Sequence, residues 1–230
     1  IYTMLTQDQI KEKIGIHAAD YIKPGMKVGL GTGSTVFYLL KELGRRKAQG
    51  LHFTAVCTSV QTQRVLIEEG IEFLTLDEVD RLQIAIDGAD EIDPAGNMIK
   101  GGGGALLREK IVEYNADELI IIIDEKKRVN NLGAFPLPVE VVTFGWKQVR
   151  QKLANDYGII VLRREHDSKP FITDQGNYIL DCHFSLITDP QQLNTDIQLI
   201  PGVVETGLFV GMADKAITGY ADGSIEFIEF

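Results

Sequence analysis

The stretch MKVGLGTGST, residues 26–35, decides the fold class of this chain. Its first half is apolar and predicts a short strand at residues 26–30, which runs directly into a loop of glycines and hydroxyls. A helix is expected at residues 35–47, because apolar residues recur there at helical spacing. A strand, a glycine loop and a helix in this order are typical of an α/β protein.

Strands and helices continue to alternate along the first half of the chain. The run LIIII at residues 119–123 has the composition of a strand that is buried on both faces of a sheet. The alternation implies right-handed crossovers, so we predict a Rossmann-like, mostly parallel sheet with ligands beyond the carboxyl ends of its strands. The other elements expected here are strands at 53–58, 71–74 and 82–86, and helices at 8–21, 61–69 and 106–114.

The pattern changes after Gly133, where Pro136 and Pro138 interrupt the alternation. Short strand-like segments and two helical segments then follow one another, which indicates a smaller α+β domain. Three strand-like segments at the end, 207–211, 216–220 and 225–230, are expected to return to the first domain. We therefore predict a catalytic α/β domain at 1–132 plus 210–230 and a second, smaller α+β domain at 133–209.

Composition narrows the possible partners of the protein. The 230 residues include 33 acids and 23 Lys or Arg, with a formal net charge of −10 and no basic block. That balance argues against a nucleic-acid partner. No apolar run approaches the roughly 20 residues needed to cross a bilayer, and no signal peptide is recognisable, so we expect no membrane and a cytoplasmic location. Cys57 and Cys182 lie in separate apolar segments, which indicates core thiols rather than zinc ligands.

The glycine loop at residues 29–35 has the features of an anion site. Its backbone N–H groups and hydroxyls precede a helix and can bind a small anion. It is not a Walker A loop, because no Gly-Lys-Ser/Thr follows. It also differs from a dinucleotide fingerprint, since Ser34 stands at the third glycine position and Cys-Thr-Ser at 57–59 replaces the ribose-binding acid. A sugar phosphate fits better than NAD, although a tight strand–helix turn would use the same residues.

Three further segments place charged groups at the ends of strands or helices. The segment DGADEID at 87–93 places four carboxylates after a strand, which suits acid–base chemistry or sugar binding, a Mg²⁺ or Ca²⁺ site, or only a solvated acidic turn. The segment KGGGGALLREK at 100–110 combines a glycine loop, a lysine and the start of a helix. Glu109 in that helix is either catalytic or a surface acid that complements the helix dipole. The charge run 126–128 follows the strand 119–123.

Four motifs occur in order, namely GTGST at 31–35, DGADE at 87–91, KGGG at 100–103 with REK at 108–110, and FPLPVEV at 135–141. Together they resemble the ribose-5-phosphate isomerase A family over about residues 6–223. The resemblance implies an isomerase of the non-oxidative pentose phosphate pathway that interconverts D-ribose 5-phosphate and D-ribulose 5-phosphate through a cis-enediolate. It also implies a homodimer whose ligand is a pentose 5-phosphate and which uses no cofactor and no metal.

The resemblance also assigns roles to individual residues. Glu109 matches the catalytic base, Asp87 and Asp90 match acids that contact sugar hydroxyls and assist ring opening, and Lys100 matches a group that stabilises the charged sugar oxygens. Lys127 matches a phosphate-binding lysine. The remaining substrate-binding positions implied by the family are Thr32, Gly33, Ser34, Thr35, Gly88, Ala89, Gly101, Gly102 and Gly103. The chain departs from the family pattern at 163–169 and from residue 212 onward, which leaves the contacts of the small domain open.

Two other classes of protein remain possible on the sequence. A sugar-phosphate sensor, such as the effector domain of a bacterial repressor, would have a related fold, but only one helix is expected before the first strand. An acyl-CoA transferase or an aminosugar-phosphate deaminase could also place a carboxylate near a glycine loop. Turnover of ribose 5-phosphate separates the isomerase from both.

Overall fold

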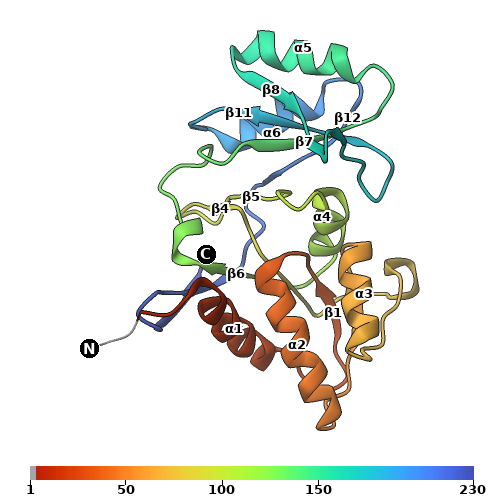
Figure 1. Cartoon of the computed structure of the whole chain (residues 1–230), viewed down its shortest axis with the longest axis vertical. Helices are drawn as coiled ribbons and strands as arrows, with labels where there is room; N and C mark the ends of the chain where they lie inside the picture. Colours follow the sequence, from red (N-terminus) through yellow and green to blue (C-terminus); the bar gives the residue numbers. More distant parts are fainter. Residues whose placement is uncertain (1–3) are drawn as a thin grey trace. The chain divides into compact units, whose positions relative to one another are not determined.

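The computed structural model describes residues 4–230, and these form two compact units of mixed α/β structure (Figure 1). The first unit contains the described residues up to Ala89 together with Arg108–Arg128 and Met212–Phe230. The second contains Asp90–Leu107 and Val129–Gly211. The predicted fold class, a mostly parallel sheet with a smaller α+β part, is confirmed.

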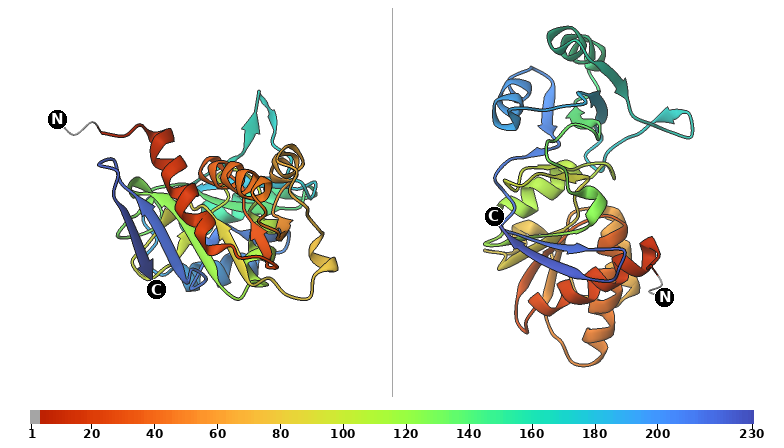
Figure 2. Two further views of the ribbon diagram at one scale, coloured as in Figure 1. Left: turned by 90° about the horizontal axis from the view of Figure 1, so that it is seen from below. Right: turned by 90° about the vertical axis from the view of Figure 1, so that its left-hand side faces the viewer.

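The first unit is built on a six-stranded sheet in the order β15-β14-β6-β3-β1-β2. β14 and β15 pair antiparallel, and the other neighbours pair in parallel. The blue β14–β15 hairpin can be followed beside the green β6 in Figure 2. The strands are β1 (Lys27–Leu30), β2 (Thr54–Cys57), β3 (Ile84–Asp87), β6 (Leu119–Asp124), β14 (Lys215–Gly219) and β15 (Ile225–Glu229).

Helices cover both faces of this sheet. α1 (Gln7–Ala18) packs against α2 (Ser34–Ala48), and α2 also contacts α3 (Val60–Glu68) (Figure 1). Their apolar residues pack against alternate residues of the strands in one core cluster. α4 (Leu106–Tyr114) places Val112 in a separate cluster, against Val56 and Leu82. Because successive strand residues face opposite sides, α4 covers the other face. The short 3-10 helices are η1 (Ala19–Tyr21), η2 (Leu76–Glu78) and η3 (Glu125–Lys127).

The second unit has a four-stranded antiparallel sheet in the order β12-β7-β11-β8, with its own apolar core against α5 (Trp146–Tyr157) and α6 (Pro190–Gln198). Two smaller sheets join it, with the orders β13-β5-β4 and β10-β9. The strands are β4 (Glu91–Ile92), β5 (Met98–Ile99), β7 (Leu137–Val141), β8 (Ile160–Arg163), β9 (Glu165–His166), β10 (Lys169–Pro170), β11 (Tyr178–His183), β12 (Val203–Thr206) and β13 (Leu208–Phe209).

Three expectations from the sequence need correction. Residues 207–211 were expected to return to the first domain, but they lie in the second unit, where β13 pairs with β5. The predicted division assigned all of 1–132 to the first domain, but Asp90–Leu107 belongs to the second unit, because β4 and β5 pair with β13 rather than with the parallel sheet. Residues 71–74 were expected to form a strand, but only a bridge between Phe73 and Ala55 forms there. Thr75 ends the extended segment, since it forms a capping box with Glu78 and starts η2.

Glu42 is a buried acid in α2, with 8% of its surface exposed. Arg45 donates to it through Nη2 at 2.6 Å and through Nε at 2.7 Å, and Arg46 donates through Nε at 2.7 Å. These bonds, above all those from Arg45, lower the pKa of Glu42 to about 2 from its ordinary value of 4.5. The folded chain therefore holds this carboxylate in its charged form well into the acid range.

We expect Glu42→Gln to reduce the acid sensitivity of the fold. Because the pKa of Glu42 is lower in the folded chain, its stabilising contribution is present above the unfolded value of 4.5 and is lost as the pH falls toward about 2. The substitution should lower the free energy of unfolding by roughly 1–3 kcal/mol at neutral pH and by much less near about pH 2.5. Urea unfolding at both pH values measures the two differences.

Glu68→Gln is the matched control, because Glu68 lies exposed at the end of α3. It should leave the free energy of unfolding nearly unchanged at both pH values. An equal penalty for Glu42→Gln at neutral and acid pH would show that the ion pairs with Arg45 and Arg46 are not its source.

Candidate active site

The carboxyl ends of three neighbouring strands meet at one edge of the parallel sheet. β1 lies between β2 and β3, and β3 lies between β1 and β6. The segments that follow these strand ends are the glycine loop from Gly31, the segment from Asp87 to Ala89, and η3 with Lys127. The first unit therefore brings these predicted site residues to a common edge, as expected for an open α/β sheet.

Asp87 is the last residue of β3 and is buried, with 1% of its surface exposed. Its Oδ1 accepts hydrogen bonds from the backbone N–H groups of Thr32 at 3.1 Å and Gly88 at 2.7 Å. Gly31 permits this close approach, because a Cβ at that position would lie 1.9 Å from the Asp87 Cγ. The backbone of the glycine loop thus fixes the orientation of this carboxylate.

The hydroxyl of Thr32 lies among other hydroxyl groups of the first unit. It hydrogen bonds with Thr58 at 2.8 Å, Ser59 at 2.7 Å and Thr62 at 3.0 Å. Thr62 in turn donates to the carbonyl of Gly31 at 2.7 Å. These bonds hold the glycine loop against the start of α3. No local pattern in the sequence predicts this cluster, since residues 57–59 indicate only that the acid of a dinucleotide site is missing.

The amino end of α2 lies in the same loop. The helix begins at Ser34, after Gly33 with a φ of 133°, and no side chain of the described residues caps it. Its first N–H groups have no partner within the helix, and the helix dipole makes this end favourable for an anion. Ser34 is exposed and Thr35 is half-buried. The backbone here can therefore bind an anionic group such as a phosphate.

Glu109 belongs to the first unit and is buried, with 4% of its surface exposed. It lies in the first turn of α4, the helix that connects β3 with the parallel strand β6. A crossover helix runs back along the sheet, so its amino end starts at the carboxyl edge of the strands. Val112, one turn later, packs against the sheet below this edge. Glu109 therefore lies at the same edge as Asp87.

Lys127 ends η3, directly after β6. It is half-buried, whereas its neighbour Lys126 is exposed. The lysine thus adds a positive charge to the edge at which Asp87 ends the adjacent strand.

The second unit holds Asp90 and the glycines 101–104. The backbone N–H of Asp90 donates to the carbonyl of Ile99 at 2.8 Å. Its side-chain Oδ2 accepts from the N–H of Gly102 at 2.7 Å. A Cβ at Gly102 would lie 2.6 Å from the Asp90 Oδ1, so glycine is required there for the carboxylate to come so close.

Lys100 precedes this loop and is a buried lysine, with 2% of its surface exposed. Its backbone N–H donates to the carbonyl of Gly207 at 2.9 Å, which anchors it beside β13. Its Nζ lies 5.3 Å from the centroid of the Phe209 ring, within the range of a cation–π interaction. A buried ammonium in this position can stabilise negative charge strongly, because little water screens it.

The other acids of the segment 87–93 have structural roles. Glu91 is buried rather than solvated, and it accepts from the backbone N–H groups of Gly133 at 2.7 Å and Phe135 at 2.6 Å. Asp93 accepts from Ala95 and Asn97 within the β4–β5 turn. Among residues 4–230, no group of three or more His, Cys, Asp or Glu side chains is arranged to hold a metal ion.

The structure divides the predicted site residues between the two units, and this corrects the expectation that the first domain holds all of them. Within the first unit lie Thr32, Gly33, Ser34, Thr35, Asp87, Gly88, Ala89, Glu109 and Lys127. Within the second unit lie Asp90, Lys100, Gly101, Gly102 and Gly103. The division follows from the pairing of β5 with β13, because β5 leads directly into the glycine loop at 101–104.

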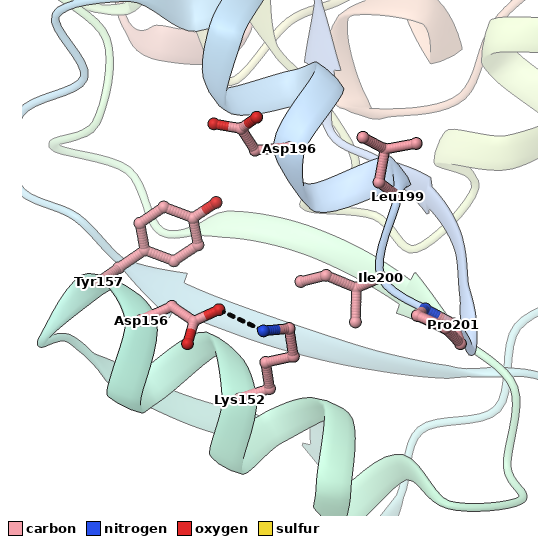
Figure 3. Close-up of a pocket in the computed structure, with 7 residues that line it drawn as sticks. All are labelled: Lys152, Asp156, Tyr157, Asp196, Leu199, Ile200 and Pro201. Atoms are coloured by element: carbon pink, nitrogen blue, oxygen red, sulfur yellow. Dashed lines mark hydrogen bonds and ion pairs between the residues drawn. The ribbon is translucent and has the colours of Figure 1, made fainter.

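A surface cavity of about 330 Å³ lies between α5 and α6 of the second unit (Figure 3). Asp156 and Lys152 on its wall pair with each other at 2.7 Å. Tyr157, Asp196 and Leu199 to Pro201 form the rest of its lining. We assign it no role in catalysis, because it is an exposed surface cavity whose lysine, Lys152, is already paired with Asp156. No helix in the described part of the chain is long and apolar enough to cross a membrane.

Comparisons with known proteins match most of the chain to one family. The family model for ribose 5-phosphate isomerase A (phosphoriboisomerase A) matches residues 54–223. Ribose-5-phosphate isomerase A of Bacillus mycoides (strain KBAB4) is 48% identical over 219 residues, which cover 95% of this chain and 99% of the relative. The corresponding protein of Bifidobacterium adolescentis (strain ATCC 15703 / DSM 20083 / NCTC 11814 / E194a) is 48% identical over 218 residues, 94% of each chain.

Solved structures of ribose-5-phosphate isomerases have the same fold as this chain. A D-ribose-5-phosphate isomerase in complex with phospho-erythronic acid superposes with a TM-score of 0.94 at 37% identity, covering 98% of this chain and 100% of the other. The ribose 5-phosphate isomerase A of Methanocaldococcus jannaschii has a TM-score of 0.92 at 38% identity, with the same coverage. The enzyme of Plasmodium falciparum has a TM-score of 0.94 at 37% identity and covers 97% of this chain and 99% of its own.

We predict that Gly31→Ala displaces Asp87 and damages the glycine loop. The new Cβ would lie 1.9 Å from the Asp87 Cγ, and both groups are buried, so either the carboxylate or the loop must move. The loss should be roughly 1–3 kcal/mol of stability, the usual cost of overpacking. Thermal or urea unfolding measures the loss, and a crystal structure of the variant locates the movement.

Ser34→Ala is the control for this substitution, because Ser34 is the exposed first residue of α2, directly after the same loop. It should leave the free energy of unfolding nearly unchanged. A Gly31→Ala variant as stable as the parent, with Asp87 unmoved, would contradict the packing described for this edge.

Proposed function

Because the chain belongs to the ribose-5-phosphate isomerase A family, we propose that it interconverts D-ribose 5-phosphate and D-ribulose 5-phosphate. The observation that carries this proposal is the near full-length match to relatives of that name, 48% identical over 95% of the chain. The residues that the family resemblance assigns to catalysis are all present in the sequence. Two of them, Asp87 and Glu109, lie buried at the carboxyl edge of the parallel sheet.

In this proposal the reaction moves a proton from C2 of the open-chain aldose to C1 through a cis-enediolate. A base removes the C2 proton, and the electrons of the broken C–H bond form the C1–C2 double bond while the carbonyl oxygen at C1 takes up negative charge. The same group, now an acid, delivers the proton to C1, and the oxygen at C2 becomes the carbonyl. A hydroxyl proton passes from O2 to O1, so that no redox cofactor is required.

We propose Glu109 as the group that carries the proton between C2 and C1. A carboxylate suits both half-reactions, since it acts as base when charged and as acid once protonated. Its burial supports this role, because electrostatic interactions with a reacting sugar are stronger where little water screens them.

Asp87 is proposed to open the sugar ring. Ring opening requires one proton to leave the C1 hydroxyl and one to reach the ring oxygen, and a single carboxylate can perform both transfers. The bonds from Thr32 and Gly88 to Asp87 Oδ1 support this role, because they fix the carboxylate in one orientation. A preoriented group avoids the cost of ordering it during the reaction.

We further propose that Lys100 and Asp90 bind the reacting end of the sugar. Lys100 would stabilise the negative enediolate oxygen, an electrostatic role that its burial strengthens. Asp90 would accept a hydrogen bond from a sugar hydroxyl. The glycines 101–103 would let backbone N–H groups approach the substrate closely.

The phosphate is proposed to bind at the amino end of α2 and at Lys127. The N–H groups at Ser34 and Thr35 and the lysine provide the positive partners that a dianion needs in a protein of net charge −10. The structural relative that binds phospho-erythronic acid, itself a phosphorylated sugar acid, supports a ligand of this size and charge. The homodimer and the place in the non-oxidative pentose phosphate pathway remain predictions from the resemblance, and the cytoplasmic location remains a prediction from the sequence.

A substrate panel tests the proposed function. The purified protein should convert ribose 5-phosphate to ribulose 5-phosphate, and it should turn over neither glucosamine 6-phosphate nor acyl-CoA. The conversion should persist after treatment with EDTA, because no step of the proposal requires a metal ion. Ketose formation followed by absorbance or by NMR gives the rate.

Each alternative predicts a different outcome. Binding of ribose 5-phosphate without conversion would favour a sugar-phosphate sensor. Release of ammonia from glucosamine 6-phosphate would favour the deaminase. Loss of activity in EDTA with recovery in Mg²⁺ would show that the acids at 87–93 bind a cation during the reaction.

A further inference from the structure

Arg164 connects the four-stranded sheet of the second unit to the glycine loop at 101–104. It follows β8, and 15% of its side chain is exposed. Its Nη1 donates to the carbonyl of Gly101 at 2.7 Å and to that of Gly102 at 3.1 Å. No motif in the sequence predicts a role for this arginine.

The guanidinium of Arg164 is itself held in place. Asp181 on β11 accepts from Nη2 at 2.6 Å and from Nε at 3.0 Å, which is a bidentate pair in a partly buried environment. The backbone N–H of Arg164 donates to the carbonyl of Ile179 at 2.8 Å, so the residue extends the pairing with β11. The Phe171 ring centroid lies 5.9 Å from the guanidinium carbon. The arginine therefore projects from a fixed support.

The peptide that joins Gly101 to Gly102 is bound at both of its ends. Its carbonyl oxygen, on Gly101, accepts from Arg164, and its N–H, on Gly102, donates to the Asp90 Oδ2 at 2.7 Å. In a trans peptide these two groups point in opposite directions, so fixing one fixes the other. The flanking residues are glycines, and Gly101 has a φ of 100°, so the backbone alone offers little resistance to rotation of this peptide.

The charge of the arginine also acts through this peptide. A cation that binds a carbonyl oxygen draws electron density from the amide and strengthens the N–H as a donor. That N–H binds the carboxylate of Asp90, so Arg164 both directs and strengthens the bond.

We propose that Arg164 is a positioning residue for the isomerase reaction, which orients Asp90 through the Gly101–Gly102 peptide. The inference rests on the proposed function, in which Asp90 contacts the substrate. Arg164 acts on Asp90 and not on the sugar. Its loss should therefore slow catalysis through a misplaced carboxylate while the fold persists.

The first experiment compares Arg164→Met with Arg163→Met. Arg163 is the matched control, because it is the neighbouring arginine, its side chain is 22% exposed, and it pairs with Glu165 and stacks on Trp146 rather than binding the loop. Arg164→Met should lower kcat for ribose 5-phosphate by roughly 10- to 100-fold, the range seen when a reacting group is displaced by about 1 Å. Arg163→Met should stay within about twofold of the parent, as expected away from the site.

A double-mutant cycle then tests whether the effect passes through Asp90. If it does, Arg164→Met should cost almost nothing further in kcat when it is added to Asp90→Asn, because the group it positions is already lost. A full additional loss in that background would overturn the proposal. If Arg164 had only a structural role, Arg164→Met would lower stability, and its effect on kcat would be the same with or without Asp90→Asn.

The results distinguish a failure of the proposed function from a failure of the positioning role. An inactive parent protein would contradict the proposed function, whereas an active parent with Arg164→Met equal to Arg163→Met would contradict only the positioning role. If Arg164→Met fails to fold, Arg164→Lys replaces it, since lysine keeps the charge but cannot bind Asp181 and the two carbonyls together. Arg164→Lys should lower kcat in the parent protein but should cost almost nothing further when it is added to Asp90→Asn. An unchanged kcat for Arg164→Lys in the parent protein would overturn the proposal.

Discussion

The first unit depends on the contact between the backbone of Gly31 and the carboxylate of Asp87, which leaves no room for a side chain. It joins the ends of β1 and β3, since Asp87 accepts from the N–H of Thr32. The same loop leads into α2, so fixing it also fixes the amino end of that helix. The proposed acid and the proposed phosphate site therefore share one backbone support.

The second unit uses the same principle with different residues. Asp90 is held by the N–H of Gly102, as Asp87 is held by those of Thr32 and Gly88. In both units a peptide group in a glycine-rich loop orients an acid, and glycine is needed for the two to come so close. The second loop has an additional support in Arg164 and Asp181. Backbone groups thus carry much of the orientation that this chemistry requires.

The parallel sheet and its loops could be predicted from the sequence, because local patterns specify strands, crossovers and glycine turns. Three features could not. The pairing of β5 with β13 joins residues more than a hundred positions apart, so Asp90–Leu107 was assigned to the wrong unit. The hydroxyls around Thr32 meet only through tertiary packing. Arg164 lies over sixty residues from Gly101, and no local pattern connects them.

The kcat of Glu109→Gln, measured for ribose 5-phosphate in D₂O, shows whether a buried carboxylate transfers the proton. The variant keeps the shape of the side chain and removes the base, so kcat should fall roughly 10²- to 10⁴-fold, with KM little changed and incorporation of deuterium at C1 lost with turnover. Glu113→Gln, a buried acid one turn further along α4, should keep the parent kcat. A near-normal kcat for Glu109→Gln would contradict the account and would transfer the role of base to another carboxylate.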